Sequence, residues 1–366
     1  MAPGRAADSN RVKILYCIRS LDVGGSQKQL ATLTSLLVVH GWEVHVAVLR
    51  DGRFESLLDP GATLHRIASS RSSDPFILAR LVRLIRGIRP DIVQTWLPQM
   101  DIFAGAAALL CRKRWILSER SSARAYSRIW PMRLRELLGR FASGIVANSR
   151  GGLDFWRGLN RRVAMHRVIP NAISVPADIP DDLSRRTSGA APMVLYAGRL
   201  DPEKRVSRLI EAMVIARREL PVTALICGEG TLRDELRLLA DRLGVSDAVE
   251  FAGHVENASP LLRRADLFVS LGWAEGAPNA VQEAVVAGVP VLLSDVPAHR
   301  ELLDESSAIF VDGDDATAIA TAILSSLRDT DAAQARARAA LRRAENWSPQ
   351  AVAAAYDTFY REVLGR

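Results

Sequence analysis

The sequence predicts an α/β protein with two Rossmann-like domains, each built on a doubly wound parallel sheet, that face a central cleft. Strand-like apolar runs alternate with segments of helical length in two series, glycine turns follow several runs, and a proline- and aspartate-rich stretch separates the series. The 366 residues are 48% hydrophobic and 24% charged, enough for two cores. The predicted parts are a first domain over 11–175, a linker over 176–192, a second domain over 193–345 and a C-terminal helix over 346–366.

The first series opens with a β-branched run at Val12–Ile18, which leads through a glycine turn at 21–25 into a helix over Gln27–His40. The same rhythm of strand and helix then continues, which favours a parallel sheet. Further strands are expected at 42–49, 91–95, 114–117 and 144–147, with helices at 76–89 and 131–142.

The second series begins with the apolar run Met193–Ala197, directly after the linker. Helical segments follow most of its strands, so a second parallel sheet is expected. Its other strands are expected at 223–227, 249–252, 267–271 and 289–293, followed by an Ala/Arg helix at 331–344 and a last helix at 351–364.

Cysteine usage and the absence of long apolar stretches indicate a cytoplasmic protein. Cys17, Cys111 and Cys227 are widely spaced and none lies in a CxxC pattern, which favours reduced core residues. The first ten residues lack the apolar stretch of a secretory signal, and no segment approaches the ~18 apolar residues of a membrane span.

Basic residues gather in the first half of the chain. The net charge is +7, but residues 1–175 hold 27 Lys and Arg against 12 Asp and Glu, and residues 112–167 hold 14 against 3. Such a density attracts anionic lipid, polyanionic saccharide or nucleic acid, although a solvated arginine-rich surface explains it equally well. Because nucleic-acid binding rests on charge alone, no nucleic-acid partner is expected.

One basic segment, Arg124–Phe141, has the composition of an interfacial helix that could reach a lipid-linked acceptor at the inner face of an anionic membrane. A core-facing helix with a basic outer face explains the same residues. The apolar members are Ile129, Trp130, Leu134, Leu137, Leu138 and Phe141, among Arg128, Arg133, Arg135 and Arg140.

The densest group of candidate site residues lies between Ala265 and Asp295, where a strand, a glycine loop and a helix beginning near Pro278 follow one another. The free N–H groups and positive dipole end of a helix N-terminus can receive a diphosphate. The residues expected to form this phosphate cradle are Gly276, Ala277, Pro278 and Asn279.

Two acids flank this cradle, Glu275 in the loop and Glu283 in the helix. Carboxylates accept hydrogen bonds from sugar hydroxyls, so the pair could hold a sugar or a ribose. An acid on a solvated helix face is the ordinary alternative for either residue.

Turns after other strands add cations and exposed backbone. Gly198, Arg199 and Lys204 follow the strand at 193–197, where ligands bind in doubly wound sheets, and Arg and Lys can hold phosphate oxygens. The turns at Gly228 and at Gly253-His254-Val255 could hydrogen-bond a base through main-chain groups, and Gly24-Gly25 opens a helix as a phosphate-facing loop would. His254 is expected to be structural.

Together these residues resemble the retaining glycosyltransferases of family four, also called group 1, which have the two-Rossmann GT-B architecture and include bacterial polysaccharide-assembly enzymes. The resemblance extends from residue 11 to about residue 360. The matching motifs are Glu275 and Glu283, with seven residues between them, in their EGAPN context, Gly198-Arg199 with Lys204, Gly228-Glu229-Gly230, Pro170-Asn171 and Gly24-Gly25.

The resemblance implies a role for each matching residue. Arg199 and Lys204 would neutralise the diphosphate of a UDP- or GDP-sugar donor, Glu283 would hold the ribose and Glu275 would contact the sugar. Transfer to a saccharide or lipid-linked acceptor would retain the anomeric configuration, with the leaving diphosphate taking the acceptor proton. No metal or other cofactor would be needed, and the helix over 346–366 would cross back to the first domain.

One position departs from the family pattern. Many relatives have a histidine near the donor sugar, where this chain has Gln99 within Thr95–Asp101. Gln99 can donate a hydrogen bond but carries no charge, so Asp101 could act in its place. Glu119 and Arg120, expected in the loop after Leu117, and Asn171 are the candidate acceptor contacts.

Two other functions stay open from the sequence. A sugar-nucleotide epimerase of the same fold would need acid and base side chains in the cleft, and these are scarce. A silent nucleotide-sugar-binding protein is favoured only by the missing histidine. A dinucleotide oxidoreductase is disfavoured because no GxGxxG opens a helix after a strand.

Overall fold

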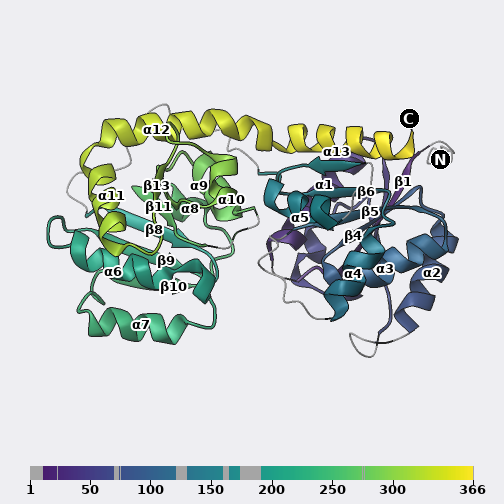
Figure 1. The fold of residues 1–366 in the computed structure, drawn as a ribbon, viewed down its shortest axis with the longest axis horizontal. Coiled ribbons are helices and arrows are strands. Elements are labelled where there is room, and N and C mark those ends of the chain that lie inside the picture. The colour runs from purple at the N-terminus through teal and green to yellow at the C-terminus, as the bar shows by residue number, and fades with distance from the viewer. Residues whose placement is uncertain are drawn as a thin grey trace, which may run out of the picture. The chain divides into compact units, whose positions relative to one another are not determined.

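The chain forms two compact units in the computed structural model (Figure 1). Unit 1 consists of Met1–Ala172 with Pro349–Arg366, and unit 2 consists of Ile173–Ser348. The structure describes residues 11–22, 24–69, 74, 76–120, 130–159, 165–173, 191–273, 275 and 277–365. Apart from residues 191 and 192, the predicted linker at 176–192 lies outside this part of the chain.

Unit 1 contains a seven-stranded parallel sheet with the order β3-β2-β1-β4-β5-β6-β7. The strand order reverses between β1 and β4, which makes that point the switch of a doubly wound sheet. The strands are β1 (Lys13–Ser20), β2 (Glu43–Arg50), β3 (Thr63–Arg66), β4 (Ile92–Trp96), β5 (Arg114–Glu119), β6 (Gly144–Ala147) and β7 (His166–Val168).

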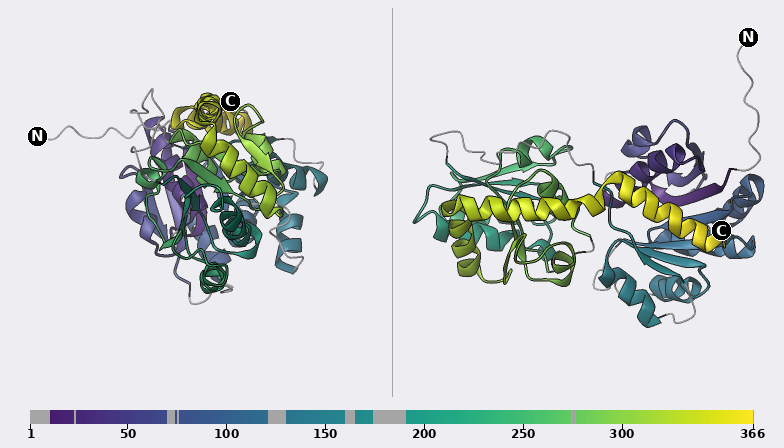
Figure 2. Two further views of the ribbon diagram at one scale, coloured as in Figure 1. Left: turned by 90° about the vertical axis from the view of Figure 1, so that its left-hand side faces the viewer. Right: turned by 90° about the horizontal axis from the view of Figure 1, so that it is seen from above.

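Helices cover both faces of this sheet (Figures 1 and 2). The strands are apolar on both sides because each face packs against helices. Helices α1 (Gly25–Val39) and α13 (Pro349–Leu364) share one core, and α2 (Phe76–Ile88), α3 (Pro98–Leu110), α4 (Trp130–Gly139) and α5 (Arg150–Leu159) contribute to the other; the short η1 (Arg53–Leu57) contacts α1.

Helix α13 belongs to unit 1 although it comes last in the chain. Tyr360 is fully buried, with its hydroxyl 2.9 Å from that of Tyr16 in β1 and donating to the Gln94 Oε1 atom in β4. The Nε1 atom of Trp42 donates to Asp357 at 2.8 Å. The helix is therefore anchored to the two central strands of the sheet.

Unit 2 contains a six-stranded parallel sheet with the order β10-β9-β8-β11-β12-β13 and its switch between β8 and β11. Helices α6, α7 and α11 pack in one core, and α8, α9, α10 and α12 contribute to the other. The strands are β8 (Met193–Ala197), β9 (Thr223–Cys227), β10 (Val249–Gly253), β11 (Leu267–Ser270), β12 (Val291–Ser294) and β13 (Ile309–Val311). The helices are η3 (Pro202–Lys204), α6 (Val206–Ala216), α7 (Arg233–Arg242), α8 (Ser259–Leu262), α9 (Asn279–Val286), α10 (Pro297–Leu302), α11 (Ala316–Arg328), α12 (Thr330–Arg343) and η4 (Ala344–Trp347).

The prediction of two doubly wound parallel-sheet domains is confirmed. The sequence did not predict the short strands β3, β7 and β13 or the helices α3 and α5. Among the described residues, no helix is both long and apolar enough to cross a bilayer.

Candidate functional site

The candidate site of unit 2 lies at the switch point of its sheet, where β8 and β11 are neighbours. The chain leaves these two strands toward opposite sides, so their following loops separate and leave room for a ligand at the carboxyl edge. The loop after β8 carries Gly198, Arg199 and Lys204, and the loop after β11 carries Glu275. Residues more than 70 positions apart in the chain thus meet at one sheet edge.

An ion pair joins the two loops. The Nζ atom of Lys204 lies 2.7 Å from Oε1 of Glu275, and the two side chains are 16% and 10% exposed. The backbone N–H of Trp273 donates to the carbonyl of Glu203 at 3.0 Å, which ties the same loops through the main chain. The pair and this backbone bond together hold the loop after β8 against the loop after β11.

Arg199 lies on the solvent side of this pair. Its side chain is 67% exposed and pairs with Asp201 and with Glu203, the latter at 2.7 Å. Exposed ion pairs of this kind contribute about 0–1 kcal/mol, so a bound diphosphate can displace them.

The turns after β8, β9 and β10 interlock through glycines. Gly228 has a φ of +144°, and a Cβ added there would lie 1.8 Å from the carbonyl oxygen of Gly198. The N–H of Gly198 donates to the carbonyl of Cys227 at 3.0 Å, and that of Gly228 to Gly253 at 2.7 Å. Only glycine fits at position 228. Val255, the predicted base contact beyond this turn, is half-buried and packs against the core beneath α9.

The predicted phosphate cradle lies at the start of α9. Pro278 is the N-cap and Asn279 the first helical residue, one position later than the sequence predicts. Ala277 and Pro278 are the described residues of the loop next to the helix, and the half-buried Glu283 lies in the helix. Gly276, the remaining member of the predicted cradle, lies outside the described residues.

Two residues near Glu275 were not predicted from the sequence to belong to the site. Trp273 is 40% exposed in the same loop, and an indole face is a surface on which a sugar ring or a base can stack. His299 is fully buried in α10, and this burial lowers its pKa, an effect that Glu275 opposes and Lys204 increases. The signal for Trp273 was an aromatic residue between a glycine and the first glutamate of the motif.

In unit 1, the Gly24-Gly25 turn and Gln99 follow β1 and β4, the two neighbouring strands at the switch of the sheet. Gly24 is the N-cap of α1 and Gly25 its first residue. Gln99 lies in the first turn of α3, a helix that the sequence did not predict. The residue before this helix, Leu97, has φ 72° and ψ 150°, a conformation that strains any residue with a Cβ. The chain therefore turns abruptly into the helix that carries Gln99.

A buried charge network holds this turn. Asp101 is fully buried, accepts from the Thr95 hydroxyl at 2.6 Å, and pairs with Arg135 of α4 at 2.7 Å. Arg135 also lies 2.9 Å from Glu119, which accepts from Trp156 Nε1 at 2.9 Å. We refer to Asp101, Arg135 and Glu119 as the buried triad.

The triad corrects two expectations from the sequence. Glu119 is the last residue of β5 and is fully buried, not a loop residue facing an acceptor. Asp101 cannot stand in for a histidine at the position of Gln99, because its carboxylate is enclosed by Thr95 and Arg135. In both cases the acid is buried because it pairs with Arg135, a buried cation on α4. The sequence around each acid gives no sign of this pairing.

The titration of Asp101 makes stability depend on pH. Burial raises its pKa from 3.8 to about 6, against the opposing effects of Arg135 and Thr95. Because the folded pKa is the higher one, this group contributes stability that is complete below pH 3.8 and is lost as the pH rises through about 6. We expect the Tm of Asp101→Asn to vary less between about pH 4 and pH 7 than that of the unaltered chain. Thermal unfolding followed by circular dichroism checks this, and parallel pH curves for the two proteins would contradict it.

The two remaining acceptor candidates contact each other. Arg120 donates to Asn171 at 3.1 Å and to the Tyr356 hydroxyl of α13 at 2.6 Å, and its guanidinium lies over the Trp96 ring at 3.9 Å. Asn171 is 3% exposed. The structure thus uses Arg120 and Asn171 to join strand ends to α13, and Arg120 is the more exposed of the two.

Within the described ranges, no group of three or more His, Cys, Asp or Glu side chains could hold a metal ion. The cations and the acids of the unit 2 site pair with each other instead.

Two family models match the chain, one in each half. "Glycosyltransferase Family 4" matches residues 23–175 and "Glycosyl transferases group 1" matches residues 183–343.

Curated relatives cover most of the chain. The "Lipopolysaccharide core biosynthesis glycosyltransferase LpsE" of Rhizobium meliloti (strain 1021) is 29% identical over 306 residues, which are 82% of this chain and 84% of the relative. A Campylobacter jejuni N-acetylgalactosamine-N,N'-diacetylbacillosaminyl-diphospho-undecaprenol 4-alpha-N-acetylgalactosaminyltransferase is 24% identical over 339 residues, which are 87% of this chain and 90% of the relative.

The fold is also similar to solved structures. Anabaena Alr3699/HepE, crystallised in complex with UDP and glucose, superposes with a TM-score of 0.81 at 19% identity, over 96% of this chain and 100% of the other.

Proposed function

We infer the function from one premise: this chain belongs to the glycosyltransferases of family 4 and has the GT-B fold. We propose that it transfers a sugar from a nucleotide diphosphate donor, a UDP- or GDP-sugar, to a saccharide or lipid-linked acceptor in cell-surface glycan or polysaccharide biosynthesis. The relatives named for lipopolysaccharide core and for a diphospho-undecaprenol substrate support this class of acceptor.

The observation that carries the proposal is the Lys204–Glu275 ion pair at the switch point of unit 2. A cation and an acid held together there suit a ligand that brings both a diphosphate and sugar hydroxyls. Lys204 and Arg199 would bind the diphosphate oxygens, and Glu275, released from Lys204, would accept hydrogen bonds from the sugar. Glu283 would hold the ribose.

We further propose a retaining reaction that needs no metal. The bond between the anomeric carbon and the diphosphate oxygen breaks, and the acceptor oxygen bonds to the same face of that carbon. The acceptor proton passes to the departing diphosphate, whose growing negative charge Arg199, Lys204 and the first turn of α9 would stabilise. In this scheme, stabilising the leaving group is the main catalytic task of unit 2, and Gln99 would contact the donor sugar.

A panel of nucleotide sugars tests the function. We expect one UDP- or GDP-sugar to release its nucleoside diphosphate when an acceptor is supplied, and Glu275→Gln to turn over about a hundredfold more slowly because one transition-state contact is lost. Glu235→Gln, which changes an exposed acid on α7, is the control. Interconversion of the sugar without release would indicate an epimerase, and binding without turnover a silent binding protein. Either result would overturn the proposal.

A lipid-linked acceptor requires contact with a bilayer, and α4 of unit 1 offers a surface for it. Trp130, Leu137 and Phe141 are 71%, 51% and 61% exposed, and Arg133 and Arg140 are exposed among them. Trp130, Arg133 and Leu137 lie on one face of α4, and Arg140 and Phe141 follow in the turn directly after its last residue, Gly139. We propose that these five residues, the α4 face, bind anionic lipid at the cytoplasmic side of a membrane.

The α4 face is narrower than the sequence suggested. Arg135 points into the core as part of the buried triad, and Leu138 packs against the core. Ile129 and Arg128, which the sequence included, lie outside the described residues. Apolar and basic side chains remain together on the outer side, as an interfacial helix requires.

Vesicle flotation tests the α4 face. We expect binding to vesicles with anionic lipid, weaker binding at high salt, and about a fivefold loss for each of Arg133→Gln and Arg140→Gln, because each charge contributes about 1 kcal/mol near such a surface. Val39→Ser changes a residue 82% exposed at the end of α1 and is the control. Equal binding of the unaltered chain to neutral and anionic vesicles, or none at low salt, would contradict the proposal.

A further inference from the structure

His299 is a buried histidine beneath the loop that carries Glu275, and the scheme above gives it no task. It lies in α10, which directly follows β12, and it is fully buried. Burial lowers its pKa; Ser294 and Glu275 act in the opposite direction, and Lys204 adds to the lowering. The ring is therefore neutral at neutral pH.

The two ring nitrogens face the ends of two neighbouring strands. Nδ1 lies 2.9 Å from the backbone oxygen of Ser294, the last residue of β12, and Nε2 lies 3.5 Å from the hydroxyl of Ser270, the last residue of β11. Because a carbonyl only accepts, Nδ1 carries the proton, and Nε2 of the neutral ring is left as an acceptor toward Ser270.

The contact continues into the Glu275 loop. The Ser294 hydroxyl donates to the carbonyl of Gly272 at 2.7 Å. A Cβ at Gly272 would lie 2.7 Å from Oε1 of Glu275, so the carboxylate rests directly against this backbone. A chain of contacts therefore runs from the imidazole through Ser294 and Gly272 to the carboxylate that pairs with Lys204.

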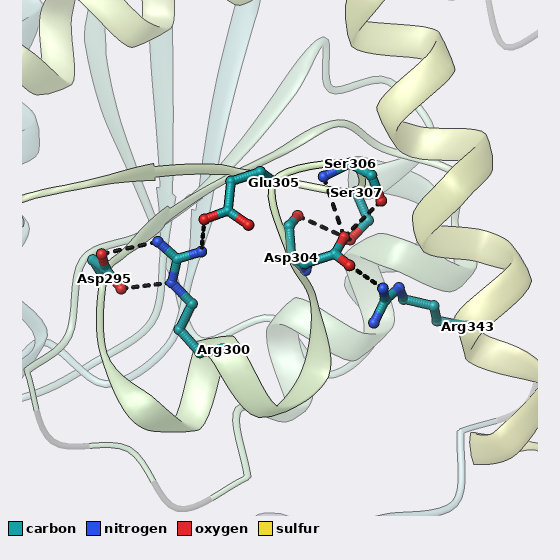
Figure 3. Close-up of polar contacts among 7 residues, drawn as sticks. All are labelled: Asp295, Arg300, Asp304, Glu305, Ser306, Ser307 and Arg343. Carbon is teal, nitrogen blue, oxygen red and sulfur yellow. Dashed lines mark hydrogen bonds and ion pairs between the residues drawn. The ribbon is translucent and has the colours of Figure 1, made fainter.

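Helix α10 is itself held firmly from outside, as Figure 3 shows. Arg300 donates to both carboxylate oxygens of Asp295, at 2.6 and 2.9 Å, and also pairs with Glu305. Asp304 binds Ser306 and Ser307 and pairs with Arg343 of α12. These contacts lie on the exposed side of α10 and of the turn after it, whereas His299 is buried, so they can be removed without touching the imidazole.

We propose that His299 is a positioning residue for sugar transfer: by joining the ends of β11 and β12 it holds the backbone of Gly272, and hence the Glu275 carboxylate that rests against it, in place for the donor. His299 acts on Glu275 through Ser294 and Gly272 and does not contact the substrate itself. The proposal rests on the proposed function for its effect on turnover, but its effect on the loop does not.

Two substitutions at His299 test whether the ring acts through its nitrogen atoms or only through its volume. His299→Asn keeps an N–H near the position of Nδ1, and His299→Leu removes both nitrogens at similar volume. We expect His299→Leu to lower kcat about tenfold or more with little change in the donor KM, and His299→Asn to recover to within about threefold of the unaltered chain. A general loss of stability would not produce this split between kcat and KM or this rescue.

A second readout does not depend on activity. Hydrogen exchange of the amides of residues 271–273, 275 and 277 is expected to be faster in His299→Leu than in the unaltered chain. It is expected to be unchanged in Arg300→Gln, which removes the outer contacts of the same helix. If the unaltered chain releases no nucleotide from any donor while exchange still responds to His299→Leu, the proposed function fails and the positioning of the loop stands.

Two results would overturn the inference. One is a folded His299→Leu protein with unaltered kcat and unaltered hydrogen exchange at residues 271–273, 275 and 277. The other is an equal loss of kcat in Arg300→Gln, which would assign the effect to α10 as a whole. Should His299→Leu fail to fold, His299→Asn and His299→Gln replace it: we expect Asn, which reproduces the Nδ1 donor, to be the more active, and equal activity would refute the role.

Discussion

A chain with alanine at both Arg199 and Lys204 is expected to bind nucleoside diphosphates about two to four orders of magnitude more weakly than the unaltered chain. Each cation would make a charge-assisted hydrogen bond to a phosphate oxygen, and such bonds contribute about 1.5–3 kcal/mol each. Lys204 should account for the larger part, since it is 84% buried with Glu275 whereas Arg199 is mostly exposed. Calorimetric titration with uridine, guanosine and adenosine diphosphates measures the loss.

Two controls make this result specific. Lys204→Ala leaves the Glu275 carboxylate without its cation, so Lys204→Ala combined with Glu275→Gln separates lost phosphate binding from new repulsion. Arg217→Ala with Arg328→Ala removes two cations from unit 2 that pair with Asp247 and Glu219 on its surface. Unchanged affinity in the Arg199 and Lys204 variant would remove the basis of the assigned donor site.

Replacing Arg135 by methionine is expected to destabilise unit 1 by about 3–5 kcal/mol. Two buried carboxylates, Asp101 and Glu119, would lose their shared cation, and an uncompensated buried charge has a cost of this size. Urea unfolding followed by tryptophan fluorescence suits the measurement because Trp156 and Trp115 contact the same network. The result expected is a lower midpoint with an unchanged slope.

Arg133→Met is the matched control, because Arg133 lies two positions earlier on α4 and is exposed. Its effect should stay within about 0.5 kcal/mol. A chain with Arg135→Met, Asp101→Asn and Glu119→Gln together should regain much of the loss, since neutral groups need no cation. If Arg135→Met and Arg133→Met have the same stability, the triad does not stabilise the fold.

The sequence was most informative about interior strands. The predicted strands at 193–197 and 223–227 have the same bounds as β8 and β9, because each is a short apolar run ended by a glycine turn and buried on both faces. The edge strands β3 and β13 escaped prediction, since they are three or four residues long and only half-buried. A run that short has no recognisable alternation.

Helix α3 was not predicted from the sequence for a different reason. Its residues, PQMDIFAGAAALL, are apolar and small on nearly every side, because the helix is packed between the sheet, α2 and α4. Without a polar face there is no helical period to read. The candidate site is affected as well, because Gln99 lies in the first turn of this unpredicted helix.

Single motifs of the candidate site were visible in the sequence, but their partners were not. The glycine turn with Arg199 and Lys204 and the loop with Glu275 were each predicted, yet their meeting depends on β8 lying next to β11. That adjacency follows from the order of strands in the sheet, which no local pattern encodes. His299 was missed for the same reason, since its partners Ser270 and Ser294 end two different strands.

The anchoring of α13 in unit 1 has a consequence for biosynthesis. The ribosome adds residues in order, yet the core that contains Tyr16 and Gln94 gains Tyr360 only after the residues up to position 360 have been made. All residues of unit 2, 173–348, have been synthesised before Tyr360 is added. Unit 1, most of which is synthesised first, is therefore the unit that completes its fold last. Until Tyr360 is added, part of its core is exposed to water and to chaperones.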